Sequence, residues 1–155
     1  MTLELNTLET SFDLIAPRGE ELVDVFYSRL FDAAPSVEPL FAHTDLRKQK
    51  SMLLATLVLL RKSLRDLEAI TPKLRQLGAR HVAYGALPEH YPVVAQVMLD
   101  SMAEIAGEAW TPEIAAAWAG ALGLVAAAML EGAEEAQVQS SCAPRCSARL
   151  AFSTP

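Results

Sequence analysis

Positive charge is in short supply in this sequence. Its 155 residues hold 13 Lys and Arg against 19 Asp and Glu, for a formal net charge of -6, and the basic residues form no cluster or stripe. Nucleic-acid-binding domains need such a basic surface, so we expect no nucleic-acid partner. Aromatic residues are few as well, at 6%, whereas 52% of the residues are hydrophobic, which is typical of one globular domain with a substantial core.

Several short motifs are also absent. The opening residues, MTLELNTLETSFDLIA, lack the positive and apolar regions of an export signal, so we expect a cytoplasmic protein. No G-x-G-x-x-G or P-loop occurs, so no nucleotide-binding module is predicted. The two cysteines, Cys142 and Cys146, match neither a Cys-x-x-Cys-His attachment motif nor a zinc spacing, and we interpret them as reduced thiols.

One long stretch contains no charge at all. Residues 114 to 130, IAAAWAGALGLVAAAML, fall at the short end of the roughly 17 to 25 residues that a membrane span requires. The stretch is rich in Ala rather than Leu, and it is flanked by Glu113 and Glu131 rather than by Lys or Arg. We therefore expect the buried central helix of a soluble protein, and no membrane partner.

The period-2 alternation that marks a strand is missing, and helix signals recur, so the predicted fold class is all-α. Three prolines mark expected helix starts, two of them after a Thr that suits the N-cap. These pairs are Thr71-Pro72, Leu87-Pro88 and Thr111-Pro112. Gly85 and Gly107 are expected to end the first two of these helices. Residues 138 to 155 turn to Ser, Pro and Cys without a helical period and predict a tail of low structural content.

One histidine is predicted to face the core. Leu74, Leu77, Gly78 and His81 follow the i, i+3, i+4, i+7 spacing of a buried helix face. A buried imidazole is either a hydrogen-bonded core residue or a ligand, because neutral imidazole is the side chain best suited to haem iron. Gly78 would let a large flat group approach the backbone. The pattern by itself leaves both roles of His81 open.

The other two histidines give weaker signals. His90 falls in the first turn of the next expected helix, where a histidine is commonly exposed or caps the turn. His43 falls in a polar connection. Neither is expected to be a ligand.

Three segments support one another when they are taken together. They are FYSRLFDAAPSVEPLFAHTDLRKQKSMLLATLVLL, LGARHVAYGALPEHYPVVAQVMLDSM and TPEIAAAWAGALGLVAAAML. Together they resemble the globin family, specifically single-domain bacterial haemoglobins and the globin domain of flavohaemoglobins, from about Leu8 to Ala136. The resemblance implies a globin domain over residues 1 to 137 and no ordered D helix. It places the helices at A 6–15, B 19–33, C 35–40, E 46–63, F 72–83, G 88–106 and H 112–135.

The resemblance also implies a haem b pocket and assigns its main residues. His81 matches the proximal histidine, which binds the iron through Nε2. Phe41 matches the phenylalanine that stacks on the haem, and Leu53 the apolar residue that lies over the iron. Tyr27 and Gln49 match the distal residues that face a bound gas.

Further contacts follow from the same resemblance. Arg80 is similar in position to a residue that pairs with a haem propionate, and Tyr91 to the tyrosine that supports the proximal histidine. The remaining implied haem contacts are apolar, namely Leu57, Leu77 and Val94. Tyr27 or Lys50 is the candidate sixth ligand of ferric iron.

The sequence departs from flavohaemoglobins in two ways. Their helix H glutamate, which belongs to the proximal network, matches Ala133 here, with Glu131 and Glu134 out of register. The flavin and nicotinamide modules have no counterpart in the chain, so we expect reduction by a separate reductase.

Two donors beside the gas predict tight binding of oxygen, with NO and CO as further diatomic ligands. The implied function is reversible oxygen binding for transport, storage or sensing. The alternatives are nitric oxide detoxification by a dioxygenase reaction, weak peroxidase activity, or a helical interaction module without haem. The oligomeric state is left open between monomer and homodimer.

Overall fold

The computed structural model describes residues 4 to 151, with side chains to residue 138, and this part of the chain contains helices and no strand. The all-α prediction is therefore confirmed. The α-helices are α1 (Leu5–Ile15), α2 (Gly19–Ala33), α3 (Leu46–Lys62), α4 (Leu67–Ala83), α5 (His90–Ala106) and α6 (Pro112–Ala151). Three 3-10 helices join them, η1 (Ala16–Arg18), η2 (Pro35–Phe41) and η3 (Gly107–Ala109). No helix lies between η2 and α3, which agrees with the expected lack of a D helix.

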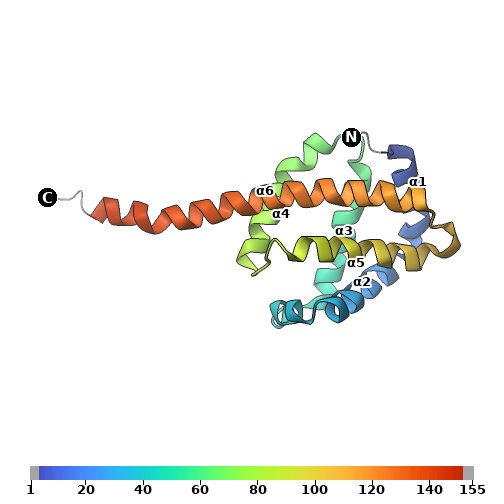
Figure 1. The fold of residues 1–155 in the computed structure, drawn as a ribbon, viewed down its shortest axis with the longest axis horizontal. Helices are drawn as coiled ribbons and strands as arrows, with labels where there is room; N and C mark the ends of the chain where they lie inside the picture. Colours follow the sequence, from blue (N-terminus) through green and yellow to red (C-terminus); the bar gives the residue numbers. More distant parts are fainter. Residues whose placement is uncertain (1–3, 152–155) are drawn as a thin grey trace.

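Helix α6 runs through the body of the molecule, and α1, α4 and α5 pack against it (Figure 1). Its Trp118 is completely buried, and the indole N–H donates a 2.9 Å hydrogen bond to Ser11 Oγ on α1. Ser11 in turn donates to the Thr7 carbonyl at 2.6 Å. A buried indole needs such a partner, so this bond ties the first helix to the last.

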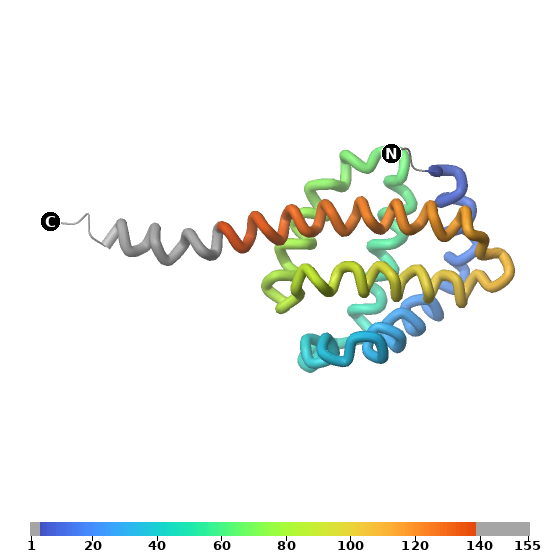
Figure 2. The backbone as a smooth tube through the Cα atoms, viewed as in Figure 1, coloured from blue at the N-terminus to red at the C-terminus, as the bar shows by residue number. Residues whose placement is uncertain are grey.

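The apolar part of α6 is buried only in part, with 22% of its most apolar 18-residue window inside the fold. By length and composition alone, Pro112–Val138 is long and apolar enough to cross a membrane. It nevertheless buries Trp118, Ala121 and Ala133 against the other helices. The backbone trace in Figure 2 shows α5 and α6 running side by side in opposite directions, joined by the turn at η3.

Two glycines let α4 and α6 approach each other closely. A Cβ on Gly78 would lie 1.8 Å from the Met129 carbonyl oxygen, and one on Gly132 would lie 1.9 Å from the Arg75 carbonyl oxygen. No side chain fits at either position, because both meet backbone of the opposite helix. Gly78 therefore accommodates α6, and the expectation that it leaves room for a flat group is wrong.

The start of α4 differs from the prediction. The helix begins at Leu67, so Pro72 lies inside it and Thr71 is not its N-cap. Instead, Thr71 Oγ1 donates a 2.8 Å hydrogen bond to the Leu67 carbonyl one turn earlier. Ile70 is buried in the core, and burial of this first turn outweighs the local preference of proline for a helix start.

The other helix boundaries follow the sequence signals closely. Gly85 and Gly107 have positive φ, 90° and 60°, directly beyond α4 and α5, where only glycine adopts such backbone without strain. The N-cap of α6 is Thr111, whose hydroxyl accepts from the Ile114 N–H at 3.2 Å. Helix α5 begins at His90, two residues beyond Pro88.

The end of α6 is a second correction. The helix continues to Ala151, whereas the sequence predicted its end at residue 135 and a tail of low structural content from residue 138. The backbone of residues 138 to 151 is helical in the structure, and the division of the chain at residue 137 stays a prediction. The side chains of Cys142 and Cys146 lie outside the described residues, as does the backbone of residues 152 to 155.

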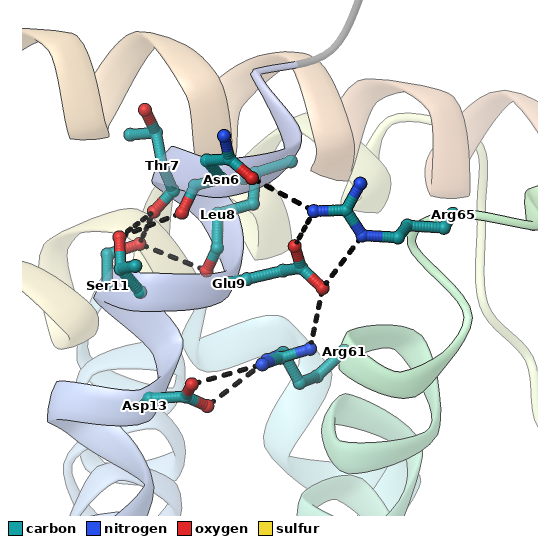
Figure 3. A network of polar contacts seen from close by, with 9 residues as sticks. Asn6, Thr7, Leu8, Glu9, Ser11, Asp13, Arg61 and Arg65 are labelled. Carbon is teal, nitrogen blue, oxygen red and sulfur yellow. Dashed lines mark hydrogen bonds and ion pairs between the residues drawn. The ribbon is translucent and has the colours of Figure 1, made fainter.

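A network of ion pairs joins α1 to the end of α3 (Figure 3). Arg61 contacts Glu9 and Asp13, each at 3.0 Å, and Arg65 contacts Glu9 and the Asn6 side chain. Hydrogen bonds from Arg65 to Glu9 and from Arg61 to Asp13 lower the pKa of each carboxyl group. We call these five residues the α1/α3 clamp.

Candidate functional site

His81 lies in the last turns of α4, and its ring is oriented by a backbone carbonyl. Its Nδ1 is 2.7 Å from the Leu77 carbonyl oxygen. A carbonyl only accepts hydrogen bonds, so Nδ1 carries the proton and, in the neutral ring, Nε2 has a free lone pair. This is the tautomer that a metal-binding histidine requires.

The backbone around His81 is fixed by the end of its helix. The Ala86 N–H donates to the His81 carbonyl at 2.9 Å, and the Gly85 N–H donates to the Val82 carbonyl at 3.1 Å. These two bonds form a Schellman motif, which requires the positive φ of Gly85. The position of the imidazole is therefore set by the helix end as well as by the Leu77 bond.

Tyr91, near the start of α5, lies beside His81, with ring centroids 6.5 Å apart. Its hydroxyl oxygen is buried and has no hydrogen-bond partner among the described residues, and burial raises the pKa of the phenol. Ala133 is buried and offers no carboxylate. Glu131 is exposed and pairs with Arg75 at 3.5 Å. The structure thus brings Tyr91 to His81, and residues 4 to 138 supply no acceptor for the Tyr91 hydroxyl.

A second group of aromatic residues forms where α2 meets η2. Tyr27 is 4% exposed, and Phe41 lies edge-on to it with ring centroids 5.8 Å apart. Phe31 is 5.5 Å from Phe41 and 6.1 Å from Tyr27. The three rings hold one another in place, so the Tyr27 side chain has little freedom to move.

Gln49, in the first turns of α3, lies beside the Tyr27 hydroxyl. Burial raises the pKa of the Tyr27 phenol, and hydrogen bonding with the Gln49 side chain offsets part of the rise. Leu53, one turn further along α3, packs against the core, and Leu57 is buried in it. The two polar residues assigned to the distal side of the pocket are therefore adjacent in space.

The remaining candidates are less enclosed. Arg80 is exposed and forms no ion pair within the described part of the chain, and Val94 is 37% exposed. Leu77 is partly buried and supplies the carbonyl that holds His81. Lys50, the candidate sixth ligand, pairs with Asp24 at 3.0 Å.

The other histidines have the positions expected of them. The His90 ring caps its turn, with Nδ1 accepting from the Leu87 N–H at 3.0 Å, and His43 is exposed. Among the described residues no three His, Cys, Asp or Glu side chains gather to hold a metal ion. A metal at His81 would therefore have to bring most of its ligands with it, as the iron of a porphyrin does.

Sequence reasoning missed two aromatic neighbours of this site. Phe31 follows Tyr27 by four residues on α2, so helical spacing offered a signal for it. Tyr84 lies with its ring centroid 6.0 Å from that of His81, although it is 62% exposed. Its contact depends on the turn after α4, for which no periodic pattern exists.

Comparisons with known proteins show the family of the chain. The globin family model matches residues 24 to 129. The flavohemoprotein of Bacillus subtilis is 31% identical over 131 residues, which cover 83% of this chain and 32% of the relative. The chain thus spans about a third of the length of the curated relatives it matches.

Two solved structures share the fold. A bacterial globin from Campylobacter jejuni has a TM-score of 0.74 at 22% identity and covers 84% of this chain and 94% of its own. An engineered carbene transferase, described as a nitric oxide dioxygenase from Rhodothermus marinus, has a TM-score of 0.77 at 23% identity, with coverages of 92% and 99%. The chain belongs to the globin family.

Proposed function

We propose that this globin binds haem b through His81 and holds a diatomic gas, foremost oxygen, beside Tyr27 and Gln49. The placement of Gln49 against the buried Tyr27 hydroxyl carries the proposal. Two polar donors in an otherwise apolar, aromatic corner have a role if a ligand that gains negative charge is held there. The name of the Bacillus subtilis relative, a flavohemoprotein, supports the choice of haem.

The residues present fit a haem. His81 would bind the iron through its free Nε2, and the Phe41 ring and the Leu53 side chain, which both pack against the core, would contact the haem. Leu57, Leu77 and Val94 supply further apolar contacts, and the exposed Arg80 guanidinium is available to a propionate. The haem would supply an iron that binds a gas reversibly.

Tyr27 and Gln49 set the strength of gas binding. The Tyr27 phenol is protonated at neutral pH, because its ordinary pKa of 10.0 is raised further by burial, so its hydroxyl is available as a donor. A charge-assisted hydrogen bond to a ligand contributes about 1.5 to 3 kcal/mol in a site shielded from water. A ligand bound this strongly is released slowly. Slow release of oxygen suits storage, sensing, or transport at low oxygen concentration, in the cytoplasm.

The second candidate function is nitric oxide dioxygenase activity, with nitric oxide detoxification as its role. It is favoured by the Tyr27 and Gln49 pair, because the same donors stabilise negative charge that develops on the reacting gas. The description of the Rhodothermus marinus protein gives further support. A separate reductase would supply electrons. Weak peroxidase activity is less favoured, because no carboxylate among the residues with described side chains bonds to the Tyr91 hydroxyl beside His81.

The experiment that tests the proposal is haem titration of the purified full chain, followed by absorption spectra of the ferric, reduced and oxygenated forms. His81→Ala is compared with His90→Ala, a matched control whose histidine only caps a turn. We expect one haem per chain in the native protein and in His90→Ala. We expect His81→Ala to lose the oxygenated form.

The outcomes separate the two candidate functions. If the His81→Ala variant takes up haem and forms the oxygenated species as the native protein does, the proposal is overturned. If haem binds as expected, nitric oxide is then added in the presence of a reductase and oxygen consumption is measured. Consumption of oxygen would support nitric oxide dioxygenase activity. Absence of nitrate formation would leave reversible gas binding as the function.

A further inference from the structure

The outward side of α3 carries exposed apolar residues between two lysines. Met52 is 60% exposed, and Ala55 and Leu59 are exposed as well, three and seven residues further along the helix. Residues at this spacing lie on one side of a helix. Lys48 comes one turn before Met52, and Lys62 follows Leu59 by three residues; both are exposed and form no ion pair within the described part of the chain. We call these five residues the α3 face.

A row of exposed apolar residues also lies on α6, with a glutamate at each end. It consists of Glu113, Ala116, Gly123, Leu124, Ala127 and Glu131, which we call the α6 face. Leu124 is 49% exposed, and nothing lies within 4 Å of a Cβ placed on Gly123. The apolar part of this row extends over about three turns of helix.

Both faces differ from the other outer surfaces of the fold. Single exposed apolar residues are ordinary in a soluble protein, whereas a contiguous exposed row marks an interaction surface. Helix α2 shows the ordinary pattern, because its exposed positions carry Asp24, Ser28 and Asp32. No element of the described part of the chain covers the α3 face or the α6 face. Each is therefore a candidate interaction surface.

The two faces match each other in charge, shape and length. Lysines end one face, and glutamates end the other. The long side chains of Met52 and Leu59 stand on the α3 face, whereas the alanines and the glycine of the α6 face let another helix approach closely. The two lysines are about 21 Å apart along α3 and the two glutamates about 27 Å apart along α6, a difference that the lysine side chains span.

We propose that the α6 face of one chain binds the α3 face of a second copy. Burial of Met52 and Leu59 against α6 supplies the apolar contact, and the charges at the ends align the two helices. The contact joins two different surfaces, so each pair of chains keeps one free face of either kind. Association therefore continues beyond two chains, into a ring or an open row.

Other partners fit these faces less well. Pairing of two α6 faces would place glutamates against glutamates, and pairing of two α3 faces would place lysines against lysines, whichever way the helices run. A lipid surface of negative charge would attract the α3 face but repel the α6 face. The charges of both faces find opposite partners only when one face meets the other.

The test is sedimentation velocity of the purified full chain over a range of concentrations. Met52→Glu with Leu59→Glu alters the α3 face, and Gly123→Glu with Ala127→Glu alters the α6 face, in each case by placing carboxylates at exposed positions. We expect the native chain to associate as its concentration rises, and each double variant to stay a single chain at concentrations at least about tenfold higher. Leu14→Glu, at an exposed leucine of α1, is the control that should associate as the native chain does.

An equimolar mixture of the two double variants identifies the faces. One variant keeps its α6 face and the other keeps its α3 face, so the mixture should form a pair with one chain of each kind and no larger species. A native chain that stays single at every concentration would overturn the proposal, and so would a mixture that forms no pair. Association of either double variant by itself would show that a face pairs with its own kind, which also overturns it.

Vesicles of phosphatidylglycerol test the lipid alternative. If the native chain does not associate but binds these vesicles, and the double variant of the α3 face does not, that face belongs to a lipid surface and the proposal is overturned. Circular dichroism checks that each variant is folded, and Met52→Glu alone replaces the double variant of the α3 face if that variant is unfolded. None of these measurements needs haem, so failure of this proposal is distinguishable from failure of the proposed function.

Discussion

The two sides of the candidate haem site are built in different ways. On the distal side, Tyr27, Phe31 and Phe41 interlock, and the one buried phenol there has Gln49 beside it. On the proximal side, His81 is held by a backbone carbonyl, and the buried Tyr91 hydroxyl has no partner among the described residues. Side-chain contacts therefore hold the residues of the distal side in place, whereas the His81 ring is oriented by a backbone carbonyl.

The helices that carry the two sides also pack against different neighbours. Helix α3, with Gln49, packs mainly against α1 and α2, whereas α4, with His81, packs mainly against α6. The two sides of the candidate site are thus supported by different helix contacts. A change in the contact of α4 with α6 should move the proximal side and leave the distal side in place.

The largest effect is expected from Gly78→Ala. The added methyl group would meet the Met129 carbonyl oxygen at 1.8 Å, so α4 has to move away from α6. We expect a loss of about 3 kcal/mol or more in the free energy of unfolding, measured by urea denaturation. Gly123→Ala is the control, because nothing lies within 4 Å of its Cβ position, and it should stabilise the helix by about 0.5 to 1 kcal/mol. Equal effects of the two variants would contradict the close packing.

Tyr27→Phe should have the next largest effect, on gas release. Loss of one charge-assisted donor is expected to raise the oxygen dissociation rate of the reconstituted protein by about 10- to 100-fold, measured by stopped-flow spectroscopy. Adding Gln49→Leu should raise it further, with less than additive effect because the two side chains interact. Tyr84→Phe, at an exposed phenol near His81, is the control. A rate unchanged by Tyr27→Phe would remove the distinction between the two sides.

Tyr91→Phe should have a smaller effect, and it should stabilise the protein where Gly78→Ala destabilises it. Its hydroxyl is buried with no hydrogen-bond partner in the described part of the chain, so its removal relieves a desolvation cost. We expect the free energy of unfolding to stay constant or to rise by up to about 2 kcal/mol, with oxygen release nearly unchanged. A clear loss of stability would show that the hydroxyl is bonded, and the proximal side would then resemble the distal side.

The smallest effect is expected at the α1/α3 clamp, which lies apart from both sides. Folding lowers the pKa of Glu9 and Asp13 from their ordinary values of 4.5 and 3.8, so the unfolded chain binds protons more readily. The contribution of the clamp is full above about pH 5 to 6, roughly one unit over those values, and it is lost at lower pH, as the pH falls from the ordinary values through the lowered pKa values of the folded state.

Thermal melts from pH 7 to pH 3 test the clamp. In the double variant with Glu9→Gln and Asp13→Asn, the melting temperature should fall less between pH 7 and pH 3 than in the native protein. Haem uptake should not change. Glu108→Gln, at an exposed carboxylate with no ion pair in the described part of the structure, is the control. An unchanged acid profile in the double variant would show that the clamp adds no stability.

Much of the fold was predictable because its signals are local. The residue types at Gly85, Gly107 and Thr111 match the backbone and cap geometry found there, since each satisfies a steric or hydrogen-bonding need within one turn of helix. The start of α4 was not predictable in this way. Burial of Ile70 is a property of the packed molecule, and it outweighs the signal of Pro72.

For the candidate site too, some features were predictable from the sequence and others depended on the tertiary structure. The sequence by itself determined the helical class and most helix ends, since periodicity and capping depend on neighbours in the chain, and its resemblance to the globin family implied the residues of the site. Only the tertiary structure decided that Gln49 lies beside Tyr27, that Gly78 meets α6 and that the Tyr91 hydroxyl has no partner among the described residues. Each of these facts depends on which helices pack together and how closely, and contacts between distant segments leave no periodic trace in one sequence.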